Sequence, residues 1–263
     1  MKILNLKKLQ QKDLIVFDLD GTIIRTKSPM EADMSRLMAK LLVAKKVAII
    51  GGGKYSIFQE LFLRKLKCSK ELLKKLFLFP TTATAFYRYS SGWKKVYALH
   101  LTVSESKKIT KAFKDVFKEI GYEHPQKTYG KIIEHRGTQI SFSVYGQDLV
   151  AELGDKGVKM KEEWSRNNFK LKMKIAGLLS KKLPDLEVHA AGFTTIDITK
   201  KGINKAYGIH QIEKHLKIPI NKMLFIGDAI FPGGNDYAVV KTGVDHLQVK
   251  GPEETKAIIK RIL

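Results

Sequence analysis

The stretch Leu14-Ile-Val-Phe-Asp-Leu-Asp-Gly-Thr22 decides the fold. Its first four residues form a continuous apolar run, and the absence of alternation is typical of a strand buried on both faces of a parallel sheet. Asp18 ends the run, Asp20 follows two residues later, and Gly21 permits the chain to turn. Ligands of open α/β sheets bind beyond the carboxyl ends of the strands. The two carboxylates therefore stand where a site is expected, with an Asp-rich turn as the alternative.

Helical patterns and buried strands alternate in the first and last parts of the chain, and a central block of residues 83–199 separates these two parts. The alternation predicts an α/β fold with a doubly wound parallel sheet. The first part of the pattern comprises a helix over 31–45, a strand over 47–50 that runs into Gly51-Gly52-Gly53, a helix over 56–67 and a strand over 76–79. The second part comprises a helix over 204–215, strands over 222–226 and 246–249, and a closing helix from Pro252. One sheet is thus expected from two separate segments.

The block between them has an antiparallel texture. Residues 84–89 alternate, Ser90-Ser-Gly92 reads as a hairpin turn, and 94–99 returns as a second strand. Further elements are expected as helices over 104–120 and 169–183 and as strands over 131–135, 139–145, 187–190 and 194–198. We therefore expect a core domain of residues 1–82 and 200–263, with an inserted α+β domain of residues 83–199.

Composition excludes several classes of protein. The chain has 263 residues, and no apolar run approaches the roughly 18 residues that a membrane span needs. The N-terminal stretch Met1–Lys8 lacks a long apolar segment, and Cys68 is the only cysteine. These features predict a cytoplasmic protein with no membrane partner.

The net charge of +22 raises nucleic acid as a partner. However, the basic residues are spread along the chain, and 41 of the 48 are Lys, whereas bidentate recognition of phosphate or guanine favours Arg. A solvated, Lys-rich surface is the favoured interpretation. General attraction of anionic substrates and weak nucleic-acid binding stay open.

Two further stretches carry candidate chemistry. Lys205 lies in Gly202-Ile-Asn-Lys-Ala-Tyr-Gly208, and the second stretch is Gly227-Asp-Ala-Ile-Phe-Pro-Gly-Gly-Asn-Asp236. The stretch around Asp18 and Asp20 resembles the first motif of the haloacid dehalogenase-like phosphatases and phosphomutases. The stretch around Lys205 resembles their third motif, and residues 227–236 resemble their fourth. The Pro-Gly-Gly-Asn-Asp segment resembles the eukaryotic-type phosphomannomutases and the small phosphatases related to them. The resemblance implies a Rossmann-like core and an inserted cap domain.

A mechanism follows from this resemblance and from charge. A carboxylate attacks a phosphate ester only beside a cation, since the phosphate oxygens repel it. Asp18 and Asp228, with the backbone carbonyl of Asp20, make a hard oxygen site suited to Mg2+ as the cofactor. Zinc is disfavoured because there is one Cys and the seven His are scattered. The resemblance implies that Asp18 is the nucleophile, that Asp20 is the general acid and base, and that Lys205 neutralises phosphoryl charge.

Other residues are expected to support the phosphate site. Asn235 and Asp236 are expected to support the metal or Lys205 without binding the substrate themselves. For Asp236, a helix cap is the alternative. Gly51, Gly52 and Gly53 fall where the family offers a Ser or Thr hydroxyl to phosphate, so a nest of backbone N–H groups would replace it, and a plain tight turn is the alternative.

The inserted domain contributes candidate substrate-binding residues by resemblance alone. Arg136 matches a substrate-facing arginine of the phosphomannomutases, and a surface ion pair is its alternative. Gln147 stands where those mutases carry a second arginine for the distal phosphate. Thr195 and Asp197 are expected to bind sugar hydroxyls, although Thr195 also suits an exposed strand.

The sequence thus predicts a Mg2+-dependent phosphatase that acts on a small phosphorylated metabolite, with a sugar phosphate preferred. A phosphohexomutase is the first alternative. The second alternative is a nonenzymatic or nucleic-acid-binding protein that uses the strong positive charge. The resemblance also implies a homodimer through the cap.

Overall fold

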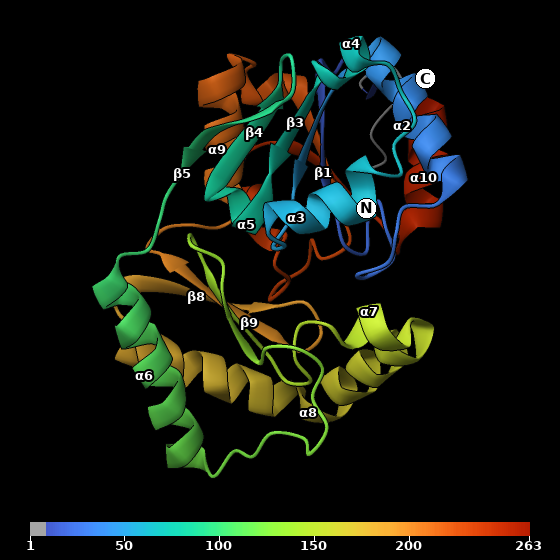
Figure 1. Cartoon of the computed structure of the whole chain (residues 1–263). Coiled ribbons are helices and arrows are strands. Elements are labelled where there is room, and N and C mark those ends of the chain that lie inside the picture. The colour runs from blue at the N-terminus through green and yellow to red at the C-terminus, as the bar shows by residue number, and fades with distance from the viewer. Residues whose placement is uncertain (1–8) are drawn as a thin grey trace. The chain divides into compact units, whose positions relative to one another are not determined.

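The computed structural model describes residues 9–263, so the expectation drawn from Met1–Lys8 lies outside the described residues. The chain divides into two compact units. The first unit is Met1–Ala98 together with Asn204–Leu263, and the second unit is Leu99–Ile203 (Figure 1).

The first unit contains a seven-stranded sheet. Its strands, in spatial order, are β11 (Asp245–Gln248), β10 (Met223–Gly227), β1 (Leu14–Asp18), β2 (Lys46–Ile50), β3 (Leu76–Phe79), β4 (Ala85–Tyr89) and β5 (Trp93–Ala98). The first five strands pair in parallel, and all five residues of β1 are buried between β10 and β2. The prediction of a doubly buried strand at the centre of the sheet is confirmed.

Helices cover both faces of this sheet (Figure 1). The helices α2 (Ala32–Ala44) and α10 (Pro252–Ile262) pack with Ile15 and Phe17 of β1, whereas α9 (Lys205–Leu216) and η3 (Tyr237–Thr242) pack with the alternate residues Leu14 and Val16. Shorter elements are α3 (Tyr55–Ile57), the π-helix η1 (Phe58–Leu63), α4 (Lys70–Leu73), α5 (Pro80–Ala83) and η2 (Ile220–Lys222). The doubly wound α/β architecture is therefore confirmed.

The hairpin of β4 and β5 corrects the expected domain boundary. β4 pairs antiparallel with β3, where Phe77 lies opposite Arg88, so both hairpin strands extend the sheet of the first unit. The insert accordingly runs from Leu99 to Ile203 and not over 83–199. The change from parallel to antiparallel pairing marks the edge of the sheet, because antiparallel edge strands are common on otherwise parallel sheets.

The second unit is an α+β structure. Its antiparallel sheet has the order β6 (Ile133–His135), β7 (Ile140–Ser143), β9 (Thr195–Lys200) and β8 (Leu186–Ala191). The helices α6 (Val103–Ile120) and α8 (Asp155–Lys182) pack on one face through a core that includes Phe113, Phe142 and Leu179 (Figure 1). A short helix, α7 (Leu149–Leu153), precedes α8. The predicted helix over 169–183 is only the second half of α8, which bends at Asn168.

Two properties of the described residues bear on the compositional expectations. None of their helices is long and apolar enough to cross a membrane. Several lysines are buried, which modifies the expectation that the lysines are solvated. They are Lys12, Lys161, Lys172, Lys205 and Lys256.

Candidate active site

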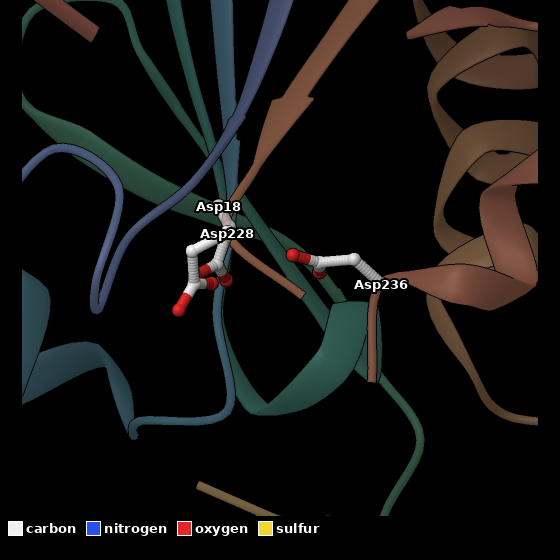
Figure 2. A group of neighbouring side chains, drawn as sticks. All are labelled: Asp18, Asp228 and Asp236. Carbon is white, nitrogen blue, oxygen red and sulfur yellow. The ribbon is translucent and has the colours of Figure 1, made fainter. Parts of the chain in front are cut away.

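The site lies where the winding of the first unit's sheet changes direction. Asp18 is the last residue of β1, and Asp228 directly follows β10, the neighbouring parallel strand. The carboxyl ends of both strands meet at this switch point, where ligands of open α/β sheets bind. Figure 2 shows the two carboxylates side by side, with Asp236 facing them from the segment after β10.

Two glycines of the sequence motifs make room for these carboxylates. Gly21 has a φ of +80°, and a Cβ atom at this position would lie 2.4 Å from Oδ2 of Asp228. A Cβ atom at Gly227 would lie 2.3 Å from Oδ2 of Asp236. Any side chain at either position would push an acidic group out of place, because real Cβ atoms do not approach so closely.

Lys205 joins the carboxylates from the opposite side. It is the first residue of α9, whose N-terminus is capped by Asn204 through a hydrogen bond from the Tyr207 N–H. Its side chain is 2% exposed, and its Nζ donates to Oδ1 of Asp18 at 2.5 Å and to Oδ1 of Asp236. Burial alone would lower the pKa of Lys205, but the two carboxylates outweigh burial and raise the pKa. The two carboxylates therefore favour the charged form of Lys205.

The charges of this cluster do not balance. Asp18, Asp228 and Asp236 each place a carboxylate oxygen here, and these three oxygens lie within 4.8 Å of one another. The ammonium of Lys205 is one positive charge beside three carboxylates. Burial and the neighbouring carboxylates raise the pKa of Asp18 well above its ordinary value. Burial, and then Asp236, raise the pKa of Asp228 to about 6. A hard divalent cation such as Mg2+ would relieve this repulsion, so the donor set fits the predicted metal.

Asp236 is fixed by hydrogen bonds at both of its oxygens. Oδ1 accepts from Lys205, and Oδ2 accepts from the Ala229 N–H at 3.1 Å. The alternative of a helix cap fails, because its side chain makes no capping bond to η3. Asp236 therefore links Lys205 to the loop that carries Asp228, whereas Asn235 is exposed.

The side chain of Asp20 is turned toward a different partner. Its Oδ1 accepts from the Lys27 N–H at 2.8 Å, and Nζ of Lys27 lies 3.6 Å from its Oδ2. The side chain of Asp20 keeps 25% of its surface exposed. It is thus oriented by Lys27 and reachable from solvent, and it stands outside the cluster of three carboxylates.

The glycine loop after β2 differs from the expected nest. No residue of Gly51–Gly53 has a positive φ, and the Gly51 N–H donates to the Phe79 carbonyl at 3.2 Å. The alternation of right- and left-handed residues that forms a nest is therefore missing. The carbonyls of Gly51 and Gly53 accept from the N–H groups of Thr82 and Thr81, both at 2.9 Å.

Those two threonines belong to a left-handed turn that no sequence pattern indicated. Thr81, Thr82 and Ala83 have φ values of 51°, 56° and 63°. Each left-handed residue other than glycine costs roughly 1–2 kcal/mol, so the surrounding structure must stabilise the turn. No sequence signal could have revealed it, since β-branched residues disfavour this conformation.

In the second unit, the structure brings Arg136 and Gln147 together. Nη2 of Arg136 donates to Oε1 of Gln147 at 2.9 Å, and Nε donates to Oε2 of Glu134 at 2.7 Å. The side chains of Arg136 and Glu134 are only 6% and 14% exposed. Arg136 therefore forms an ion pair, and this pair is part-buried rather than at the open surface.

Thr195 and Asp197 lie on β9 of the same sheet. The Thr195 hydroxyl donates to the Ala191 carbonyl at 2.5 Å. Asp197 is 5% exposed, and its buried Oδ1 has no hydrogen-bond partner among the described residues. Its direct neighbours across the sheet are Ser141 and His189, which the sequence analysis did not single out.

Ligands of open α/β sheets bind at the switch point, and the carboxylates of Asp18 and Asp228 lie there with the buried ammonium of Lys205. The family model of the haloacid dehalogenase-like hydrolases matches residues 15–242, and the chain belongs to this family. It is an enzyme of the haloacid dehalogenase type, as its motifs predicted.

Known relatives agree with this assignment. The chain is 24% identical to a phosphomannomutase of Encephalitozoon cuniculi over 93% of this chain and 91% of the relative. It is 22% identical to a phosphomannomutase of Saccharomyces cerevisiae over 97% and 96%. The fold is similar to that of the IMP-nucleotidase of Plasmodium falciparum, with a TM-score of 0.70, 17% identity, and coverage of 98% of this chain and 71% of that chain. For the trehalose-6-phosphate phosphatase of Aspergillus fumigatus, the TM-score is 0.54 at 16% identity, and 98% and 95% are covered.

Proposed function

We propose that the protein is a Mg2+-dependent phosphatase that hydrolyses a small phosphorylated metabolite, preferably a sugar phosphate, through an aspartyl-phosphate on Asp18. The observation that carries this proposal is the buried contact of Asp18 with Lys205, next to Asp228. A nucleophilic carboxylate needs a fixed cation beside it, and here the cation is held in place by a second carboxylate, Asp236.

In the first step, a carboxylate oxygen of Asp18 forms a bond to phosphorus while the bond from phosphorus to the alcohol oxygen breaks. Lys205 offsets the negative charge of the carboxylate and of the transferring phosphoryl group. Mg2+ held by Asp18, Asp228 and the carbonyl of Asp20 would withdraw charge from the phosphoryl oxygens. The loop of Gly51, Gly52 and Gly53 is proposed to border the phosphate, in a shape fixed by the left-handed turn.

Asp20 is proposed to move the protons. It would protonate the departing alcohol oxygen and then take a proton from the water that attacks the aspartyl-phosphate. Its hydrogen bond from the Lys27 N–H orients the side chain, and its exposed surface lets water reach it. Asp236 acts by positioning Lys205, and Asn235 is assigned only a supporting role in the same loop.

The second unit is proposed to act as a cap that recognises the rest of the substrate, with Arg136, Gln147, Thr195 and Asp197 as candidate contacts. We retain a homodimer through this unit as a proposal, to be checked by gel filtration of the full chain.

A phosphohexomutase is the second candidate, because the relatives named above are phosphomannomutases. A mutase must hold a bisphosphate in two orientations, which requires strong cationic groups for the distal phosphate. Here, one of the two positions is the neutral Gln147, and the other, Arg136, is paired with Glu134. A bisphosphate held this weakly would leave before it reoriented, and water would resolve the aspartyl-phosphate.

We therefore expect net release of phosphate and little isomerisation. The protein is incubated with mannose 1-phosphate, Mg2+ and a catalytic amount of hexose 1,6-bisphosphate. The concentrations of free phosphate and of mannose 6-phosphate are then measured over time. Efficient formation of the 6-phosphate with little free phosphate would overturn the phosphatase and establish the mutase.

Replacing Asp228 with Asn should weaken Mg2+ binding by at least about a hundredfold, because a neutral amide replaces a metal-binding carboxylate. Thermal unfolding with and without Mg2+ measures this directly: Mg2+ should raise the Tm of the wild-type protein much more than that of the variant. Affinity in the wild-type protein should also fall as the pH drops below about 6, since protonation of Asp228, whose pKa is raised to about 6, competes with the metal.

Asp185→Asn is the matched control, because the Asp185 side chain is 81% exposed and lies in the second unit. It should keep the full Mg2+ response. An equal loss of response in both variants would remove Asp228 from the metal site.

A further inference from the structure

Exposed cations gather along the edge of the first unit's sheet at which the parallel strands begin. Lys222 directly precedes β10, and Lys46 is the first residue of β2. Backbone hydrogen bonds set them side by side, because the Asp13 N–H donates to the Lys222 carbonyl at 2.9 Å and the Lys46 N–H donates to the Asp13 carbonyl at 3.3 Å. Asp18 ends β1, so this edge lies opposite the candidate active site.

The β4–β5 hairpin adds two cations to the same edge. β4 runs antiparallel to β3, so the hairpin turn at residues 90–92 lies where the parallel strands begin. Arg88 stands directly opposite Lys94 across the hairpin, and both are exposed. Like charges placed opposite each other destabilise a strand pair. The pair is therefore unfavourable by itself, and a bound anion would relieve it.

The end of α9 places further cations beside the hairpin. Residues 217–222 connect α9 to β10, so α9 ends at the edge where β10 begins. Near this end, the His215 ring stacks on Tyr97 of β5, with 5.1 Å between the ring centroids. Lys214 and Lys217, on either side of His215 in the sequence, are exposed. They extend the line of cations past the hairpin.

The acids of this edge do not neutralise these cations. Asp245 is bound by the buried Lys12, and Glu71 pairs with Lys74 at 2.9 Å. The exposed Asp13 lies in the row itself. Six exposed cations form no ion pair with an acid among residues 9–263, and we call this set the basic edge. They are Lys46, Arg88, Lys94, Lys214, Lys217 and Lys222.

Aromatic rings stand next to the cations of the hairpin. Tyr89 lies opposite Trp93 at the turn, and their rings meet edge to face with 5.6 Å between the centroids. Trp93 packs against the core, and Tyr89 is partly exposed. Cations that follow a phosphate backbone, with an aromatic ring on which a base can stack, are typical of surfaces that bind single-stranded nucleic acid. Five of the six cations are Lys, which suits phosphate contacts better than the reading of bases.

We propose that the basic edge binds single-stranded nucleic acid without sequence preference, through its phosphate backbone and through a base stacked on Tyr89. The cations come from residues 46–222, and the fold alone brings them together. This binding goes beyond the proposed phosphatase and does not rest on it, since the edge lies at the other end of the strands from Asp18.

The test measures fluorescence anisotropy of a labelled single-stranded oligonucleotide of about 16 nucleotides with the full chain at several salt concentrations. Affinity should fall as salt rises. The double variant Arg88→Gln/Lys94→Gln should bind at least about tenfold more weakly, and the slope of log K against log salt should become shallower by about 1.4, because each phosphate contact contributes about 0.7. Lys214→Gln/Lys217→Gln should have the same effect.

Lys111→Gln/Lys114→Gln is the matched control, because it removes two exposed cations from α6 of the second unit and changes the net charge equally. It should leave both affinity and slope unchanged. Hydrolysis of p-nitrophenyl phosphate should be the same in all three double variants, and Asp18→Asn should bind the oligonucleotide as the wild-type protein does.

Tyr89→Leu should weaken binding of the single strand about tenfold without changing the salt slope, because it removes stacking and no charge. Binding of a duplex of the same length should not respond to this variant, since its bases are already stacked on one another.

Equal losses in the edge and control variants would overturn the proposal, because the total charge alone would then account for binding. An unchanged affinity in Tyr89→Leu would also overturn it. So would a poly-glutamate of matched charge, or vesicles of phosphatidylserine and phosphatidylcholine, that bound the protein as tightly as the oligonucleotide. A protein that binds the oligonucleotide but hydrolyses no phosphate ester would refute the proposed function and leave this proposal supported.

Discussion

Replacing Asp18 with Asn should lower turnover by about three orders of magnitude or more while the protein remains folded and becomes more stable without Mg2+. Turnover falls because the amide cannot attack phosphorus. Stability rises because burial and two neighbouring acids, which raise the pKa of Asp18, outweigh the contact with Lys205, which lowers it, and Asn carries no charge. A gain of about 1 kcal/mol would raise the Tm by roughly 2–4 °C.

The measurement pairs single-turnover kinetics with thermal unfolding in a chelating buffer. Asp18→Asn should show both lower turnover and higher stability without Mg2+. The control variant Asp185→Asn should change neither quantity. Comparable turnover in Asp18→Asn would end the aspartyl-phosphate hypothesis, and lower stability without Mg2+ would contradict the charge argument.

The sequence was sufficient for the central sheet because its strands are buried on both faces, which leaves an unbroken apolar run such as 14–17 or 47–50. The turn at Gly21 was also predicted, and its φ of +80° agrees with it. The close approach of Gly21 to Asp228 depends on the folded sheet. Local patterns therefore located both strand ends that carry Asp18 and Asp228, and the family resemblance added Lys205.

Features that depend on distant partners were beyond the sequence. The left-handed turn at 81–83 is held by buried surroundings, and the loop of Gly51 by that turn. The hairpin over 85–98 joins a sheet edge that no local pattern identifies. Glu134 and Arg136 are only two residues apart in the sequence. Their low exposure of 14% and 6%, however, results from the folded unit and could not be predicted locally.

Replacing Lys205 with Met should cause the largest loss of stability of any single change in the site, and it should abolish turnover. Met approximates the volume of the side chain but leaves Asp18 and Asp236 buried without a cation. Removing one partner of a buried ion pair typically costs about 3–5 kcal/mol. Added Mg2+ should recover part of the stability, because it compensates the same carboxylates, but not the activity.

Lys256→Met is the matched control. Lys256 is also buried and also contacts three acids, Glu31, Asp33 and Glu253, but their side chains are 42%, 46% and 75% exposed. Water can solvate these acids once the cation is gone, so the loss of stability should be much smaller, and turnover should be retained.

The double variant Lys205→Met/Asp236→Asn separates the two roles of Lys205. Neutralising Asp236 removes one of the two carboxylates that the lysine balanced, so the double variant should be more stable than Lys205→Met alone. Turnover should stay abolished, since no cation then stands beside Asp18. If turnover returned together with stability, Lys205 would act only in folding, and the attack of Asp18 would have to draw its charge compensation from elsewhere in the site.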